Sequence, residues 1–180
     1  MATLTSACGL LAISLTIAAL PSQAEEYFTK AVGGKGGGPF VLHCPAGTLL
    51  TGLSSRQGAY INYIAPICNG EERNGSGTPG NKLDAACPAG TYIGNMSVLS
   101  LRSRNRLLKA VAVHCNRITD NYETEVIALK SPGEYTDYFK FNNNSSPYPI
   151  TAISCGAGRS VGIQGRSGAA VDALGLICAR

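Results

Sequence analysis

Several features are missing from this sequence, and each absence excludes a class of protein. Residues 25 to 180 show no clear helical periodicity, which argues against a helical fold. No run of five or six charges of one sign occurs, although the net charge is +4, so we expect no nucleic-acid partner. The sequence has no nucleophile motif, paired-carboxylate signature or phosphate loop, so we expect no enzyme. A glycosidase whose carboxylates meet only in the folded chain stays open.

Metal-binding signatures are also missing. His43 and His114 each precede a cysteine, but no C-x-x-C or H-x-x-x-H spacing accompanies them. Disulfide formation would also consume the thiolates that a metal requires. We therefore interpret the two histidines as residues at strand ends and expect neither a metal nor a cofactor.

The first 24 residues carry no charged side chain and contain an apolar run from Cys8 to Leu20. Such a run, followed by small residues up to Ala24, is typical of a secretory signal peptide. It falls short of the ~20 apolar residues that a membrane-spanning helix needs, although a short membrane anchor is the alternative. We predict a signal peptide over residues 1–24 and an extracellular or periplasmic mature chain, residues 25–180, without a transmembrane segment.

What the mature sequence does contain is typical of an all-β domain. Glycine is abundant, with 22 residues, and eight tyrosines but no tryptophan are present. Short apolar runs bounded by Gly, Pro and Asn predict antiparallel strands. These runs are 40–42, 48–53, 61–67, 92–101, 107–113, 125–129, 150–153, 161–163 and 171–177. Residues 69–81 and 141–149 are predicted loops, and no linker divides residues 25–180 into two domains.

A cysteine-bounded unit occurs three times, in repeats that cover about residues 40–68, 87–115 and 155–178. When the closing cysteines are aligned, Arg56 matches Arg166 and Gly58 matches Gly168. A repeat of this size cannot bury its apolar face alone, so three copies predict a core closed by pseudo-threefold packing.

The repeat also predicts the disulfides. Six cysteines remain after the signal peptide, with one pair in each copy. The predicted bridges are Cys44–Cys68, Cys87–Cys115 and Cys155–Cys178. Each would close a loop of a length for which chain entropy gives roughly 3 kcal/mol of stabilisation.

Two segments together resemble the jacalin-like family of β-prism proteins. Residues 32–40, VGGKGGGPF, resemble the glycine-rich opening loop of these lectins, and Gly168 to Asp172 match their GxxxD loop. The threefold repeat with a disulfide per copy is also similar to vitelline membrane outer layer proteins. The resemblance implies a type I β-prism of three Greek-key sheets, with the N-terminal segment paired beside the last strands.

The resemblance further implies a saccharide site where these two segments meet. In the lectins, loop amides donate to sugar hydroxyls and the aspartate accepts from two of them, which suits a carboxylate beside glycines. The implied carbohydrate-binding residues are Gly33, Gly34, Gly168, Ala169, Ala170 and Asp172. Alanines and a valine stand where the family often has aromatic residues, which implies weaker affinity or a different ligand. The alternative is that Asp172 only caps a turn.

The first copy of the repeat leaves room for a second, degenerate site. Gly58 and Asn62 occupy the positions of Gly168 and Asp172, and Tyr60 adds an aromatic surface. The second copy has lost both the glycine and the acceptor, since its corresponding positions are Asn105 and Lys109.

Three arginines alternate in the second copy, at Arg102, Arg104 and Arg106, with Lys109 nearby. On a strand their guanidinium groups would share one face and could bind anionic glycans or anionic lipid head groups. A solvated sheet face is the alternative.

The sequence thus predicts a secreted, non-catalytic, lectin-like module whose partners are saccharides or glycoconjugates, with anionic ones and an oligomer left open. Two other functions remain open at this point. One is a structural or coat protein similar to vitelline membrane components, and the other is the recognition subunit of a secreted toxin or effector.

Overall fold

The computed structural model describes residues 25–101, 106–120, 122–130 and 149–180. The predicted signal peptide over residues 1–24 lies outside this part of the chain and stays a prediction. The described residues form fourteen β-strands and no helix, so none of them form a helix that could cross a membrane. The strands are β1 (Glu26–Phe28), β2 (Val32–Gly33), β3 (Gly38–His43), β4 (Leu50–Gln57), β5 (Ile61–Cys68), β6 (Glu71–Glu72), β7 (Ser76–Gly77), β8 (Asn81–Ala86), β9 (Thr91–Ser100), β10 (Leu108–Arg117), β11 (Glu123–Lys130), β12 (Ile150–Ser154), β13 (Arg159–Ser167) and β14 (Val171–Ala179).

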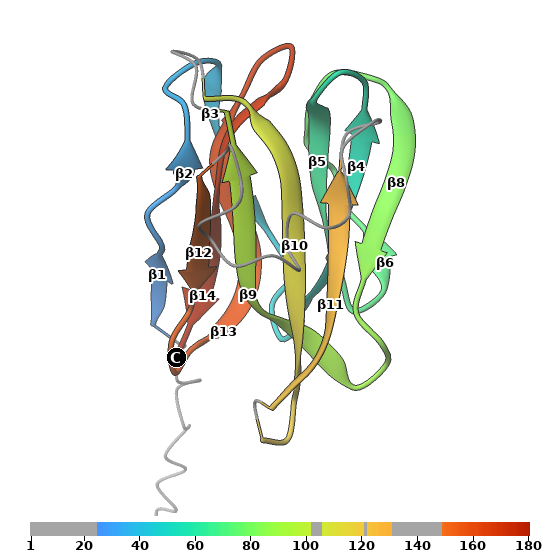
Figure 1. Cartoon of the computed structure of the whole chain (residues 1–180). Helices are drawn as coiled ribbons and strands as arrows, with labels where there is room; N and C mark the ends of the chain where they lie inside the picture. The colour runs from blue at the N-terminus through green and yellow to red at the C-terminus, as the bar shows by residue number, and fades with distance from the viewer. Residues whose placement is uncertain (1–24, 102–105, 121, 131–148) are drawn as a thin grey trace, which may run out of the picture.

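The strands form three antiparallel sheets with one shared topology (Figure 1). Sheet A has the order β1-β14-β13-β3, with β2 also beside β14. Sheet B has the order β6-β5-β4-β8, with β7 also beside β5, and sheet C has the order β11-β10-β9-β12. In sheets B and C a central hairpin is flanked on one side by the strand that follows it and on the other by a returning strand, which is a Greek key, and in sheet A strands from the N-terminal side take both flanking places. The predicted type I β-prism is therefore confirmed.

Sheet A is assembled from both ends of the described chain. Its central hairpin, β13–β14, comes from the third repeat, whereas its outer strands β1, β2 and β3 come from the N-terminal side. Tyr27 pairs with Cys178 and Gly33 pairs with Ala173. This pairing confirms the expectation drawn from the resemblance, and it brings the glycine-rich segment beside the GxxxD segment.

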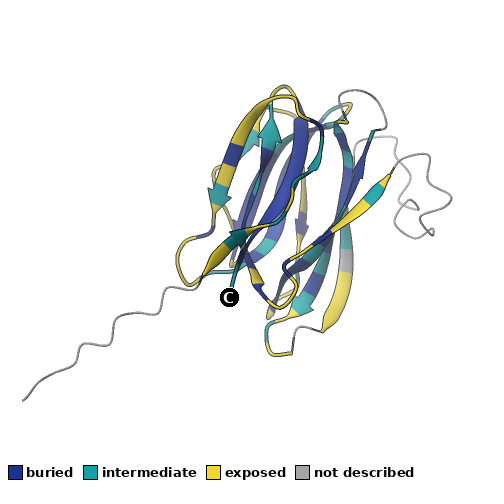
Figure 2. Cartoon of the chain, turned by 90° about the vertical axis from the view of Figure 1, so that its left-hand side faces the viewer, coloured by how far each residue is buried: buried dark blue, intermediate teal, exposed yellow. Residues whose placement is uncertain are grey.

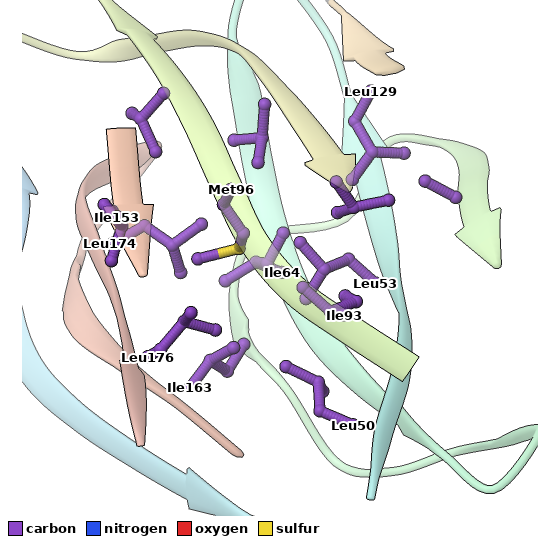
Figure 3. Packing of buried hydrophobic residues seen from close by; sticks show 14 of the residues in the cluster. Leu50, Leu53, Ile64, Ile93, Met96, Leu129, Ile153, Ile163, Leu174 and Leu176 are labelled. Atoms are coloured by element: carbon purple, nitrogen blue, oxygen red, sulfur yellow. The ribbon is translucent and has the colours of Figure 1, made fainter. Parts of the chain in front are cut away.

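The core lies between the three sheets and receives side chains from all of them. Leu53 and Ile64 come from sheet B, Ile93 and Met96 from sheet C, and Leu174 from sheet A (Figure 3). All five are fully buried. Each sheet thus covers the apolar faces of the other two, as the threefold repeat predicts.

Burial separates the central strands from the outer ones (Figure 2). Eight of the nine residues of β14 are buried, whereas Ala85 is the single buried residue of β8. The central hairpins therefore read as nearly continuous apolar runs, and the outer strands do not.

The three disulfides confirm the predicted pairing, with Cys44–Cys68, Cys87–Cys115 and Cys155–Cys178. In each central hairpin the second strand begins at a turn and carries its cysteine near the opposite end. The bridges therefore lie at one end of the prism, the disulfide end. The hairpin turns lie at the other end, which we call the turn end (Figure 1).

The prediction of a loop over residues 69–81 was wrong in part. This segment contains β6 and β7 and leads into β8. These strands show no apolar pattern in the sequence because they are short, polar and at the sheet margin, where one face contacts solvent. The predicted loop 141–149 lies, except for its last residue, outside the described residues.

Candidate functional site

Two loops meet at the turn end, the glycine loop of residues 33–38 and the turn of residues 168–172. The backbone N–H of Gly34 donates to the carbonyl of Asp172 over 2.7 Å. A Cβ placed on Gly168 would lie 3.4 Å from the Cα of Gly37, which is van der Waals contact. The fold therefore brings together the residues that the resemblance implied for a saccharide site.

The carboxylate of Asp172 lies beneath this glycine loop. Asp172 is 6% exposed. A Cβ on Gly36 would overlap its Oδ1 atom, and a Cβ on Gly37 would lie 2.6 Å from its Oδ2 atom. Gly37 also has a φ of +59°, a conformation that glycine adopts without steric cost. Glycine at both positions lets the loop approach the carboxylate.

Among the residues that the structure describes, none donates a hydrogen bond to the Asp172 carboxylate. Burial raises the pKa of Asp172, and the nearby guanidinium of Arg166 opposes that rise. The carboxylate oxygens are not among the described side-chain atoms that are buried without a hydrogen-bond partner, so they keep access to solvent and can accept hydrogen bonds from it. Hydroxyl donors from outside the protein would satisfy them.

Arg166 holds the glycine loop over the carboxylate. Its Nε donates to the carbonyl of Gly36 over 2.8 Å, and its Nη2 donates to the carbonyl of Gly37 over 2.6 Å. The guanidinium thus holds two consecutive loop carbonyls toward β13. Such a planar pair of donors is specific to arginine.

The turn itself is closed by its backbone. Gly168 N–H donates to the carbonyl of Ala170 over 2.9 Å, and Gly58 does the same with Tyr60 over 3.0 Å in the first copy. The amides of Gly34 and Gly168 are thus engaged within the protein. Among described residues, the amides of Gly36, Gly37 and Ala169 have no such partner.

The residues between Gly168 and Asp172 differ in exposure. Ala169 is exposed, whereas Ala170 is 7% exposed and Val171 is fully buried. Of the three apolar residues that replace the aromatic ones common in the family, Ala169 alone therefore faces solvent. A sugar ring bound here would have a small apolar surface to rest on.

The first copy contains an equivalent pair of loops that sequence reasoning missed. Gly77 has a φ of +122° and pairs with Tyr63, just as Gly33 has a φ of +135° and pairs with Ala173. Thr78 N–H donates to the carbonyl of Asn62 over 2.9 Å, the counterpart of the bond from Gly34 to Asp172. The signal lies in the spacing of Gly75, Gly77 and Gly80, which is also typical of an ordinary loop.

The residues predicted for the second site lie beneath this loop. A Cβ on Gly58 would lie 2.7 Å from the Nδ2 atom of Asn62, so the Asn62 amide lies against the turn. The ammonium of Lys109 lies 5.0 Å from the centre of the Tyr60 ring and donates to the carbonyl of Ala59 over 3.3 Å. Lys109 from the second copy thus covers one face of the aromatic ring in the first copy.

The two loop pairs are in direct contact. Thr78 Oγ1 donates to the carbonyl of Ala169 over 3.0 Å, and the hydroxyl groups of Ser76 and Ser167 lie 2.6 Å apart. Residues 75–80 and 168–172 therefore form one continuous surface at the turn end.

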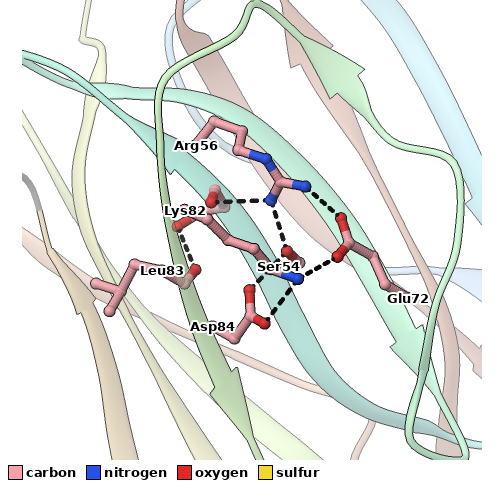
Figure 4. A network of polar contacts seen from close by, with 7 residues as sticks. Ser54, Arg56, Glu72, Lys82, Leu83 and Asp84 are labelled. Carbon is pink, nitrogen blue, oxygen red and sulfur yellow. Dashed lines mark hydrogen bonds and ion pairs between the residues drawn. The ribbon is translucent and has the colours of Figure 1, made fainter.

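A charged network anchors the loop of the first copy (Figure 4). Glu72 accepts from Arg56 over 2.8 Å and from Lys82 over 2.7 Å, and Asp84 lies 3.2 Å from the Lys82 ammonium. The hydrogen bond from Lys82 is the main reason that the pKa of Glu72 is lowered. Because Glu72 precedes residues 75–80 and Lys82 follows them, the network joins both ends of the loop.

The arginine ridge is only partly within the described residues. Arg102 and Arg104 lie outside them, whereas Arg106 is exposed with a φ of +46°. Lys109 does not lie on a shared open face, since it contacts the turn of the first copy.

Each of the two histidines lies beside a glutamate in the structure. His43 ends β3 as predicted, 3.6 Å from Glu26, but His114 lies within β10, which corrects its assignment to a strand end. Nδ1 of His114 lies 2.9 Å from Glu123. The described residues contain no group of three or more His, Cys, Asp or Glu that could hold a metal ion.

An open hollow of about 1030 Å³ lies at the disulfide end, between Cys44, Leu49 and Arg159. Its polar groups are already used within the protein. Arg159 donates to the carbonyl of Ile118 over 2.9 Å, and Asn69 accepts from the Leu49 N–H over 3.1 Å. The turn end is therefore the stronger candidate, because an accessible carboxylate without a donor among the described residues lies there.

No protein-family model and no curated protein sequence matches the chain. Solved structures of lectins do match it. The wild-type Malaysian banana lectin shares 18% identity and a TM-score of 0.59, with 87% of this chain and 98% of the lectin covered. A mannose-specific jacalin-related lectin from Morus nigra, in complex with mannose, shares 18% identity and a TM-score of 0.54, with 92% and 100% covered. The mannose-binding lectin from champedak shares 15% identity and a TM-score of 0.58, with 89% and 100% covered.

These similarities extend over nearly the whole length of each lectin. At this level of identity they establish architecture. The chain has the jacalin-like β-prism fold.

Proposed function

We propose that the chain is a secreted, non-catalytic carbohydrate-binding protein whose main site lies at the turn end. The proposed site comprises Gly33, Gly34, Gly168, Ala169, Ala170 and Asp172, together with the loop glycines Gly36 and Gly37. The observation that carries the proposal is the Asp172 carboxylate, which lies against the glycine loop, has no donor among the described residues and keeps access to solvent. Adjacent sugar hydroxyls would supply two donors to one carboxylate.

The surrounding loops suit the same ligand. The amides of Gly36, Gly37 and Ala169 have no partner among described residues and would donate to sugar oxygens. Glycines allow the backbone to approach a ring closely. The structure of the Morus nigra lectin is that of a complex with mannose, so mannose and its oligomers are the first ligands to test.

The first copy offers a second, weaker site of the same design. Its support is the matched geometry of Gly77 and Thr78 above Asn62. An amide oxygen is a weaker acceptor than a carboxylate, and Lys109 already covers one face of the Tyr60 ring. We expect this site to contribute mainly to the binding of longer saccharides.

The test is the variant Asp172→Ala, measured by calorimetry against mannose oligomers and on a glycan array. Loss of charge-assisted hydrogen bonds costs ~1.5 to 3 kcal/mol, or roughly ten- to a hundredfold in affinity. Asp120→Ala is the matched control, because Asp120 is an exposed acid outside the turn end. Full retention of saccharide binding by a folded Asp172→Ala protein would refute the site.

A further inference from the structure

The positive charge of the protein is concentrated at the turn end. The described residues contain twelve Lys and Arg and nine Asp and Glu. Lys35, Arg106, Lys109 and Arg166 lie at or beside the loops and turns of the turn end, around the single carboxylate of Asp172. The net charge of the described residues is +3, so cations in excess gather near the candidate site.

Several cations elsewhere are neutralised by local partners. Arg56 and Lys82 pair with Glu72, Arg73 pairs with Glu71, and Arg117 lies 3.5 Å from Asp120. Neither Lys35 nor Arg106 forms an ion pair with any described residue. Both are exposed. Their field is therefore directed to solvent, where it attracts anions.

These cations come from different repeats but surround one surface. Lys35 lies within the glycine loop that covers Asp172. Arg106 lies in the β9–β10 connection, and the adjoining Leu108 side chain would lie 2.9 Å from a Cβ on Gly33. Lys109 reaches the turn of the first copy at Ala59. The glycine loop thus lies beside the basic connection of the second copy.

We propose that the turn end takes acidic saccharides, sulfated or uronic, with ring hydroxyls at Asp172 and the anionic groups on Lys35 and Arg106. This inference rests on the proposed function, since it names the class of saccharide for that site. Arg166 is engaged with two loop carbonyls, so it offsets the charge of Asp172 rather than contacting the anionic group.

The arrangement favours saccharides over other polyanions. A single-stranded nucleic acid needs aromatic platforms for its bases. The two described aromatic rings beside the turns are already in contact with cations, because Lys109 covers one face of Tyr60 and Arg56 lies over Tyr63, which also packs against Gly75. A hydroxyl acceptor at the centre of a basic surface suits a ligand that carries both hydroxyl and anionic groups.

The experiment compares a heparin-derived hexasaccharide with its chemically desulfated counterpart. We expect the sulfated form to bind at least about tenfold more tightly, with an affinity that falls as salt rises, because charged contacts are screened. The double variant Lys35→Gln/Arg106→Gln should remove most of this preference. Its matched control is Lys30→Gln/Arg180→Gln, which removes one exposed lysine and one exposed arginine outside the turn end.

Each outcome decides one claim. Equal binding of the two hexasaccharides, with both weakened by Asp172→Ala, would overturn the acidic class and leave the proposed function intact. Sulfated binding that is unchanged in Asp172→Ala, or equalled by a DNA oligonucleotide of the same charge, would mean unselective polyanion binding and would overturn the inference. Sulfated binding that is lost in the Lys35/Arg106 variant, kept in the control and weakened in Asp172→Ala would support it.

Discussion

Gly36 lies so close to Asp172 that a Cβ at residue 36 would overlap the Oδ1 atom of the carboxylate. The two residues come from opposite ends of the described chain, one from the loop after β2 and the other from the start of β14. Their contact depends on the pairing of Gly33 with Ala173 and on the hold of Arg166 over the loop. The loop can therefore lie against the carboxylate only because residue 36 is a glycine and has no side chain.

The first prediction is that Gly36→Ala weakens saccharide binding while the protein stays folded. The added methyl group must displace the carboxylate or lift the loop, because it has no room between them. Gly36 does not have a positive φ, so the effect is not one of backbone strain. We expect a loss of about tenfold or more in affinity, comparable to the loss of one charge-assisted hydrogen bond.

Gly38→Ala is the matched control for this variant. A Cβ on Gly38 has no atom within 4 Å, although the residue is only two positions away. Calorimetric titration of both variants with the same ligand separates the effects. Equal affinities of Gly36→Ala and Gly38→Ala would contradict the role given to the carboxylate.

The second prediction concerns the dependence of stability on pH. Burial raises the pKa of Asp172, so in a window above the ordinary carboxyl pKa the native state binds more protons than the unfolded state. The contribution of Asp172 is fully present below its unfolded pKa and is lost as the pH rises through its folded pKa. As the pH rises, the free energy of unfolding of the wild type should therefore fall relative to that of Asp172→Asn, whose side chain cannot ionise.

Denaturant unfolding of both proteins at acidic and neutral pH measures this difference. The free energy of unfolding of the variant minus that of the wild type should be more positive at neutral pH than at acidic pH. Saccharide binding by the variant should be weakened. A constant difference across the pH range would show that the folded and unfolded pKa values of Asp172 are the same.

The third prediction separates stability from binding. The double variant Cys155→Ser/Cys178→Ser removes a bridge that closes a loop between residues separated by 23 positions. Chain entropy predicts a loss of roughly 3 kcal/mol in the free energy of unfolding. The affinity of the folded fraction for saccharide should stay the same, because this bridge lies at the disulfide end. Measurements at a temperature well below the midpoint of unfolding give both quantities, and a large loss of affinity there would mean that the two ends are coupled.

Much of the framework could be read from the residues because it depends on local pattern. The cysteine repeat predicted the three bridges, and the apolar runs predicted the strands of the central hairpins. Strands β6, β7 and β8 were missed because their residues are mostly exposed at the sheet margin, and polar residues there resemble a loop.

The repeats and cysteines by themselves predicted a threefold core and its disulfides, since these patterns are carried by neighbours along the chain. Through the family resemblance, the sequence also pointed to the three-sheet prism and to Asp172 and the glycines as candidate residues. Only the tertiary structure decided that Gly36 and Gly37 contact that carboxylate, that no described residue donates to it, and that Lys35 and Arg106 lie at the same end. The physical reason is register. Pairing of β2 with β14, and the packing of the second repeat beside them, determines which distant residues meet, and no local pattern specifies those contacts.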